Sequence, residues 1–85
     1  MLTIVNRKGL HARASAKLVQ LAAGFQSEIT IAKDGVRVVG TSIMGLLMLA
    51  AAPGCVIEAS AIGPDAVQAL DAIEALVKDR FGESE

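Results

Sequence analysis

The chain has 85 residues, of which 53% are hydrophobic, and a net charge of −1 at pH 7. A chain of this length has room for one hydrophobic core, so we expect residues 1–85 to form a single domain. With two Phe and no Trp or Tyr it is a poor candidate for base stacking, and the near-zero net charge argues against a nucleic-acid partner.

The first half of the chain is typical of a strand, a helix and a hairpin. Alternation over residues 2–6 predicts a strand, and apolar residues from Ala14 to Phe25 at helical spacing predict a helix from Ala12 to Gly24. The turn dipeptide Asp34-Gly35 then joins predicted strands 28–32 and 36–39. This register sets Lys33 opposite Val36 and Ile31 opposite Val38. It predicts a shared buried face of Ile29, Ile31, Val36 and Val38.

The second half indicates a short apolar helix, a strand and a longer helix. Ser42 is a suitable N-cap for the apolar run 43–49, and residues 55–62 form a predicted strand with Ile57, Ala59 and Ala61 inward. Pro64 at the first position and Asp65 open the last helix, which Gly82 ends. Its expected core face is Val67, Leu70, Ile73, Leu76 and Val77.

The order βαββαβα predicts an α+β fold, an open-faced sandwich in which a four-stranded antiparallel sheet is covered on one face by three helices. The pattern by itself does not choose the strand order. The run 43–55 is shorter than the roughly 20 residues of a spanning helix, so we expect no membrane insertion. The single Cys55, together with the absence of a leader pattern, favours a cytoplasmic protein.

His11 is the only histidine and stands at the start of the first predicted helix. The free N–H groups of Ala12 and Arg13 at that end would bind an anion such as phosphate, and the Arg13 guanidinium could add a forked contact. The positive helix end would also disfavour the imidazolium and leave a neutral nucleophile. The alternative is that His11 is a capping or surface residue without chemistry.

Other uses of His11 find less support. No second His exists to share a metal, and Cys55 lies in a distant strand, so we expect no metal site. A hydrolase triad needs an acid that orients the His, and no acid occurs before Glu28.

Charge is distributed unevenly around His11. Residues 1–27 contain four basic residues and no acidic residue, whereas the remaining residues contain the other four basic and all nine acidic residues. The four are Arg7, Lys8, Arg13 and Lys17. This asymmetry predicts an anionic ligand or an acidic partner surface near His11, although solvated side chains alone would give the same pattern.

Motifs along nearly the whole chain resemble one family. Gly9-Leu10-His11-Ala12-Arg13, then Thr41-Ser42-Ile43-Met44-Gly45, then Gly63-Pro64-Asp65 are similar to the motifs of HPr. HPr is the histidine-containing phosphocarrier of the bacterial phosphoenolpyruvate-dependent phosphotransferase system. The resemblance implies three helices on one side of the sheet and strands ordered one, four, two, three.

The resemblance also implies a function. His11 would accept a phosphoryl group from phospho-enzyme I on Nδ1 and pass it to IIA proteins or domains, with Arg13 as the active-site arginine. No cofactor is implied, and the protein would be a phosphoryl carrier rather than a stand-alone enzyme. The chain departs from the family at Ala14, where Pro is usual.

Two further features follow from the resemblance. Ser42 matches the position at which HPr kinase/phosphorylase modifies many members, and its role as an N-cap is compatible with this. Lys17 together with Leu46, Leu47 and Met48 is expected to form a docking surface beside His11, since exposed apolar patches mark partner sites. The other interpretation is that the apolar run is entirely core.

The alternative function is a regulatory interaction module of the nitrogen-related branch of the same system. Such a module would act through binding that depends on phosphorylation rather than through sugar uptake. Ala14 and the apolar run Leu46-Leu47-Met48-Leu49 motivate this hypothesis.

Overall fold

The computed structural model describes residues 1–83, so the last two residues of the expected 1–85 domain lie outside the described part. Four strands form one antiparallel sheet in the order β1-β4-β2-β3, which confirms the implied strand order. The strands are β1 Leu2–Thr3, β2 Glu28–Lys33, β3 Val36–Val39 and β4 Val56–Ile62.

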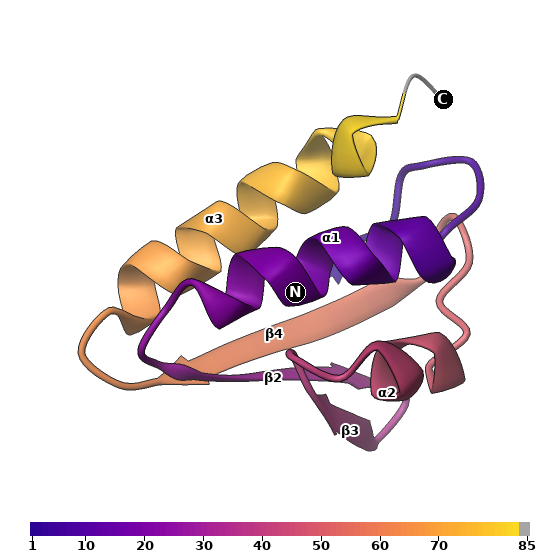
Figure 1. Cartoon of the computed structure of the whole chain (residues 1–85). Helices are drawn as coiled ribbons and strands as arrows, with labels where there is room; N and C mark the ends of the chain where they lie inside the picture. The colour runs from indigo at the N-terminus through magenta and orange to yellow at the C-terminus, as the bar shows by residue number, and fades with distance from the viewer. Residues whose placement is uncertain (84–85) are drawn as a thin grey trace.

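Helices cover one face of this sheet. Helices α1 (Ala12–Ala23) and α3 (Ala66–Lys78) run along β4 and β2, and the short α2 (Ile43–Met48) lies near β3 (Figure 1). Gly45 permits this approach, since a Cβ there would lie 2.9 Å from the Val38 Cβ atom. The expected α+β open-faced sandwich is confirmed. None of the helices within residues 1–83 has the length and apolarity to span a membrane.

The hairpin has the predicted register, with Lys33 opposite Val36 and Ile31 opposite Val38. Ile31 is fully buried and Val38 is partly buried against the core. The prediction that Val36 is buried was wrong, because 54% of this residue is exposed. Val36 adjoins the turn at the free end of the hairpin, so it shares the inner face without lying under a helix.

The first strand is shorter than predicted. Sheet pairing ends at Thr3, although Ile4 is buried and its N–H donates to the Cys55 carbonyl over 2.8 Å. From there the chain turns, and the Gly9 N–H donates back to the Asn6 carbonyl. The residues before His11 therefore form a folded loop rather than the end of a strand.

Helix α3 buries only part of the face that the sequence predicts, including Ile73 and Val77. Its buried residues are Ala69, Ile73 and Val77, whereas Val67 is 68% exposed and Leu70 is only half-buried. Ala69, Ile73 and Val77 follow one another at intervals of four residues and share one face of the helix, whereas Val67 lies two residues before Ala69 and so on the opposite side. Predicting Val67 as core was wrong for this reason.

Both ends of α3 also differ from the prediction. Pro64 precedes the helix instead of occupying its first position, and Asp65 is the N-cap residue without a side-chain capping bond. At the other end α3 stops at Lys78, before the predicted Gly82, and a 3-10 turn η1 (Arg80–Gly82) follows. In this turn Arg80 and Phe81 both have φ of 55°, which brings the Phe81 side chain into the core.

Candidate functional site

His11 is the N-cap of α1, as the sequence predicted. Its backbone is extended, with φ −78° and ψ −176°, and its carbonyl accepts from the Ser15 N–H over 2.8 Å. The ring Nδ1 atom accepts from the Arg13 N–H over 3.3 Å. Nδ1 therefore lies at the positive end of the helix dipole, where an anion attached to it would be stabilised.

The loop that presents His11 is fixed to the stretch after α2. Gly9 has φ +65°, and a Cβ added there would lie 2.4 Å from the Ala51 carbonyl oxygen. Next to it, the Leu10 N–H donates to that same Ala51 carbonyl over 2.8 Å. Only glycine allows the two backbones to come this close at this φ.

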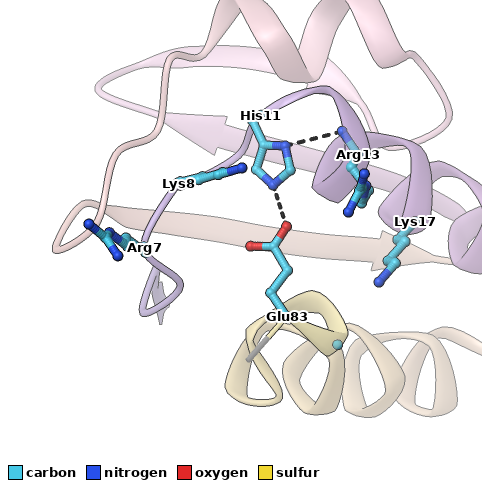
Figure 2. Close-up of a pocket in the computed structure, with 7 residues that line it drawn as sticks. Arg7, Lys8, His11, Arg13, Lys17 and Glu83 are labelled. Atoms are coloured by element: carbon cyan, nitrogen blue, oxygen red, sulfur yellow. Dashed lines mark hydrogen bonds and ion pairs between the residues drawn. The ribbon is translucent and has the colours of Figure 1, made fainter. Parts of the chain in front are cut away.

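The basic residues of the N-terminal region line a pocket of about 390 Å³ beside His11 (Figure 2). Its lining is Arg7, Lys8, His11, Arg13, Lys17, Gly82 and Glu83. The structure thus brings all four cations of the first 27 residues to one hollow with the histidine. This arrangement supports the interpretation of the charge asymmetry as an anion-binding feature.

Glu83 is the site residue that sequence reasoning missed. Its Oε2 atom is hydrogen-bonded to the His11 Nε2 atom (Figure 2). Its Oε1 atom accepts from the Asn6 Nδ2 over 2.9 Å. No acidic residue precedes Glu28 in the sequence, and Glu83 stands 72 residues after His11. A local motif could not reveal it, because the turn at Phe81 brings the tail back to the loop.

The Asn6 hydrogen bond is the main cause that lowers the pKa of Glu83 below its ordinary value, and the contacts with His11 and Lys17 add to this, while burial opposes it. Glu83 is therefore a carboxylate at neutral pH. A carboxylate can only accept, so the proton of a neutral His11 ring belongs on Nε2. The Arg13 N–H, which can only donate, points to a lone pair on Nδ1. Both partners favour the same tautomer.

Lys17 takes part in holding the tail. Its Nζ atom donates to the Phe81 carbonyl over 2.5 Å, and its side chain also lines the pocket. Lys17 therefore connects α1 to the turn that carries Glu83.

The apolar run of α2 is divided between core and surface. Leu46 is fully buried, so the expectation that it belongs to an exposed docking surface was wrong. The exposed residues, here called the α2 patch, are Ile43, Met44, Leu47 and Met48. Ser42 caps this helix as predicted, since its Oγ accepts from the Gly45 N–H over 3.0 Å.

The side chains around His11 do not form a set of metal ligands. Within residues 1–83, no three His, Cys, Asp or Glu side chains come together as a metal-binding group. The neighbours of His11 are cations and one carboxylate, a set that suits an anion rather than a metal ion.

Residues 1–79 match the family model described as the PTS HPr component phosphorylation site. The chain belongs to the HPr family. It is 51% identical to the phosphocarrier protein HPr of Cupriavidus necator over 83 residues, covering 98% of this chain and 93% of the relative. It is also 48% identical to the phosphocarrier protein NPr of Shewanella violacea over 82 residues, covering 96% and 90%.

A solved HPr structure supports the same assignment. The crystal structure of HPr-C-His from Thermoanaerobacter tengcongensis superimposes with a TM-score of 0.94 at 40% identity, covering 99% of this chain and 94% of that one. The chain is thus a member of the HPr/NPr phosphocarrier family of the phosphotransferase system. Within the HPr fold, Ala14 is completely buried near the start of α1.

Proposed function

We propose that residues 1–85 act as one phosphocarrier domain, in which His11 accepts a phosphoryl group from phospho-enzyme I and passes it to IIA proteins or domains. The observation that carries the proposal is the pocket, where Nδ1 of His11 lies at the start of α1 among four cationic side chains. No cofactor is needed, because the chemistry is the transfer of a group between two nucleophilic atoms.

In the proposed step, the Nδ1 lone pair attacks phosphorus. The Nδ1–P bond forms while the bond from phosphorus to the donor atom of phospho-enzyme I breaks, and its electron pair leaves with that atom. The ring keeps the proton on Nε2 and becomes positively charged. The reverse of these bond changes on a IIA nucleophile completes the transfer. The chain is a carrier in both steps.

The positive residues of the pocket have two roles in this proposal. Arg13 contacts the oxygens of the transferring group with its guanidinium, and the N–H groups of Ala12 and Arg13 meet them from the helix end. Lys8 and Lys17 supply the surrounding field that attracts an acidic partner surface. We place the protein in the cytoplasm, because the unpaired Cys55 suits a reducing compartment.

The test is phosphorylation by the cognate enzyme I with labelled phosphoenolpyruvate. We expect an acid-labile label on the wild-type chain and on Ser42→Ala, and none on His11→Ala. A folded wild-type chain that takes up no label from its own enzyme I would contradict the proposal.

The α2 patch is proposed as part of the docking surface together with Lys17. Leu47 and Met48 are 36% and 77% exposed, so a partner can reach them. Replacing both with Ala should weaken binding to enzyme I while thermal unfolding stays near that of the wild type. Binding that is unchanged in titration calorimetry would remove the patch from the interface.

Ser42 is proposed as a site for HPr kinase/phosphorylase where that enzyme is present. A phosphate there would lie at the start of α2, beside the exposed Met44, and would repel an acidic partner. Ser42→Asp should therefore slow phosphorylation of His11 by enzyme I, whereas Ser42→Ala should leave the rate near the wild-type value.

A regulatory role in the nitrogen-related branch is the second candidate, and the match to an NPr supports it. The two roles predict different preferred partners. Phosphotransfer rates with the sugar-type and the nitrogen-type enzyme I and IIA of the same cell would discriminate them, and a clear preference for the sugar-type pair would exclude the regulatory alternative.

A further inference from the structure

Glu83 lies in the pocket with its carboxylate between the loop before α1 and the end of η1 (Figure 2). We propose that Glu83 is a positioning residue, which holds the His11 ring with its proton on Nε2 and thereby presents Nδ1 as the nucleophile. This inference deepens the proposed function and rests on it for its biological use. The tautomer itself is a property of the isolated chain.

The two contacts of the ring are complementary. Glu83 Oε2 accepts from Nε2–H, and the Arg13 N–H donates to Nδ1 over 3.3 Å. In the other tautomer, the lone pair of Nε2 would face the Glu83 carboxylate, and the N–H of Nδ1 would face the Arg13 N–H. Two favourable contacts would thus be replaced by two unfavourable ones.

Glu83 is itself held in place. Its other oxygen accepts from Asn6, whose side chain is completely buried and also donates to the Gly9 carbonyl over 2.7 Å. Asn6 thus ties the carboxylate to the loop that presents His11. The buried Phe81 and the bond from Lys17 to its carbonyl fix the tail two residues earlier. The carboxylate is thus held at a fixed place beside the His11 ring.

The negative charge of Glu83 matters once transfer begins. When Nδ1 bonds to phosphorus the ring becomes a cation, and its Nε2–H then forms a charge-assisted hydrogen bond with the carboxylate. Glu83 therefore stabilises the charge that develops on the ring, as an orienting acid does beside a catalytic histidine. No acidic residue precedes Glu28 in the sequence, and the fold brings Glu83 to His11 instead.

The experiment separates the hydrogen bond from the charge. Glu83→Gln keeps an acceptor oxygen but removes the charge, Glu83→Ala removes both, and Asp79→Asn removes the charge of an exposed acid that does not line the pocket. The ¹⁵N chemical shifts of the neutral ring report the tautomer. Phosphoramidate, a small phosphoryl donor, then measures the reactivity of Nδ1 by ³¹P NMR without enzyme I.

We expect the Nε2–H tautomer to dominate in the wild type and in Asp79→Asn, and to lose its dominance in Glu83→Ala. The amide of Glu83→Gln can donate as well as accept, so this variant tests the charge through the rate. Phosphorylation by phosphoramidate should slow about tenfold or more in both Glu83 variants, the scale of one hydrogen bond to a charged group, and stay unchanged in Asp79→Asn. Circular dichroism verifies that each variant is folded.

Two results would overturn the inference. One is a Glu83→Ala chain that keeps the wild-type tautomer, and the other is a rate within twofold of the wild type in both Glu83 variants. Failure of the proposed function has a different signature. In that case enzyme I would not phosphorylate the wild type, while the tautomer and the phosphoramidate rates would still depend on Glu83.

Discussion

Gly9 determines how His11 is presented. It combines a φ of +65° with an approach to the Ala51 backbone that leaves no room for a side chain. Gly54 has a similar φ of +88° but has open space where its Cβ would be. A side chain at Gly54 would strain only the backbone conformation. A side chain at Gly9 would strain the backbone and also clash with Ala51.

Gly9→Ala should lower the free energy of unfolding by about 3 kcal/mol or more, and Gly54→Ala by only about 1–2 kcal/mol. Both variants pay for the left-handed conformation, and only Gly9→Ala must also move the Ala51 carbonyl. Urea denaturation measures the difference. Equal losses in the two variants would show that the contact with Ala51 does not constrain the loop.

At the level of the elements, Asp65 joins the entry of α3 to the loop between α1 and β2. Its carboxylate accepts from the N–H groups of Gln26 and Ser27, each over 2.9 Å, and from the Ser27 hydroxyl over 2.5 Å. Gly63 makes room for this contact, since a Cβ there would lie 2.6 Å from the Ser27 Cα atom. An acid predicted to serve its own helix therefore connects two elements instead.

The bond from the Ser27 hydroxyl and that from the Gln26 N–H lower the pKa of Asp65 below its ordinary value of 3.8, and burial opposes them. A carboxyl whose pKa falls on folding stabilises the protein above its unfolded pKa, and the contribution is lost as pH falls through the folded pKa. We expect Asp65→Asn to be less stable than the wild type at pH 7, with the difference shrinking below pH 3.8.

Denaturation at several pH values measures this difference, and Asp71→Asn on the exposed face of α3 controls for the change in net charge. If the difference in free energy of unfolding between the wild type and Asp65→Asn stays constant from pH 7 to pH 2, the Asp65 carboxylate does not stabilise the fold in this way.

Across the whole molecule, residues 7–17 and residues 82–83, which are far apart in the sequence, meet at the site. The basic residues come from the first 17 positions and the carboxylate comes from position 83. Phe81 makes this meeting possible, because its side chain is completely buried while the next two residues line the pocket. The core and the site are thus connected through one turn.

Phe81→Ala should cost about 3–5 kcal/mol of stability, the usual loss for a buried aromatic side chain. It should also release Glu83 from His11, because the turn loses its anchor. Thermal unfolding measures the loss of stability, and the ¹⁵N shifts of His11 report whether Glu83 still contacts the ring. Phe81→Leu, which refills most of the volume, should recover much of both. A destabilised Phe81→Ala whose His11 tautomer is unchanged would show that the tail is held by other contacts.

The sequence by itself determined most of the fold, because local signals carry it. Asp34-Gly35 set the hairpin register, Ser42 and Gly24 marked helix ends, and the family motifs implied the strand order. The sequence also predicted that His11 stands at the start of a helix and that the basic residues of the first 27 positions lie near it. These features depend on neighbours a few residues apart, or on motifs whose spacing is fixed.

Only the tertiary structure decided which apolar residues are core and which acid meets the histidine. Val67 and Leu46 could each be placed on either side of a helix by spacing alone, and packing assigned the first to solvent and the second to the core. The Glu83 contact spans 72 residues and depends on a left-handed turn at Phe81 that no local pattern encodes. Such contacts arise when distant segments close around one core, which is why sequence reasoning found the histidine and missed the residue that orients it.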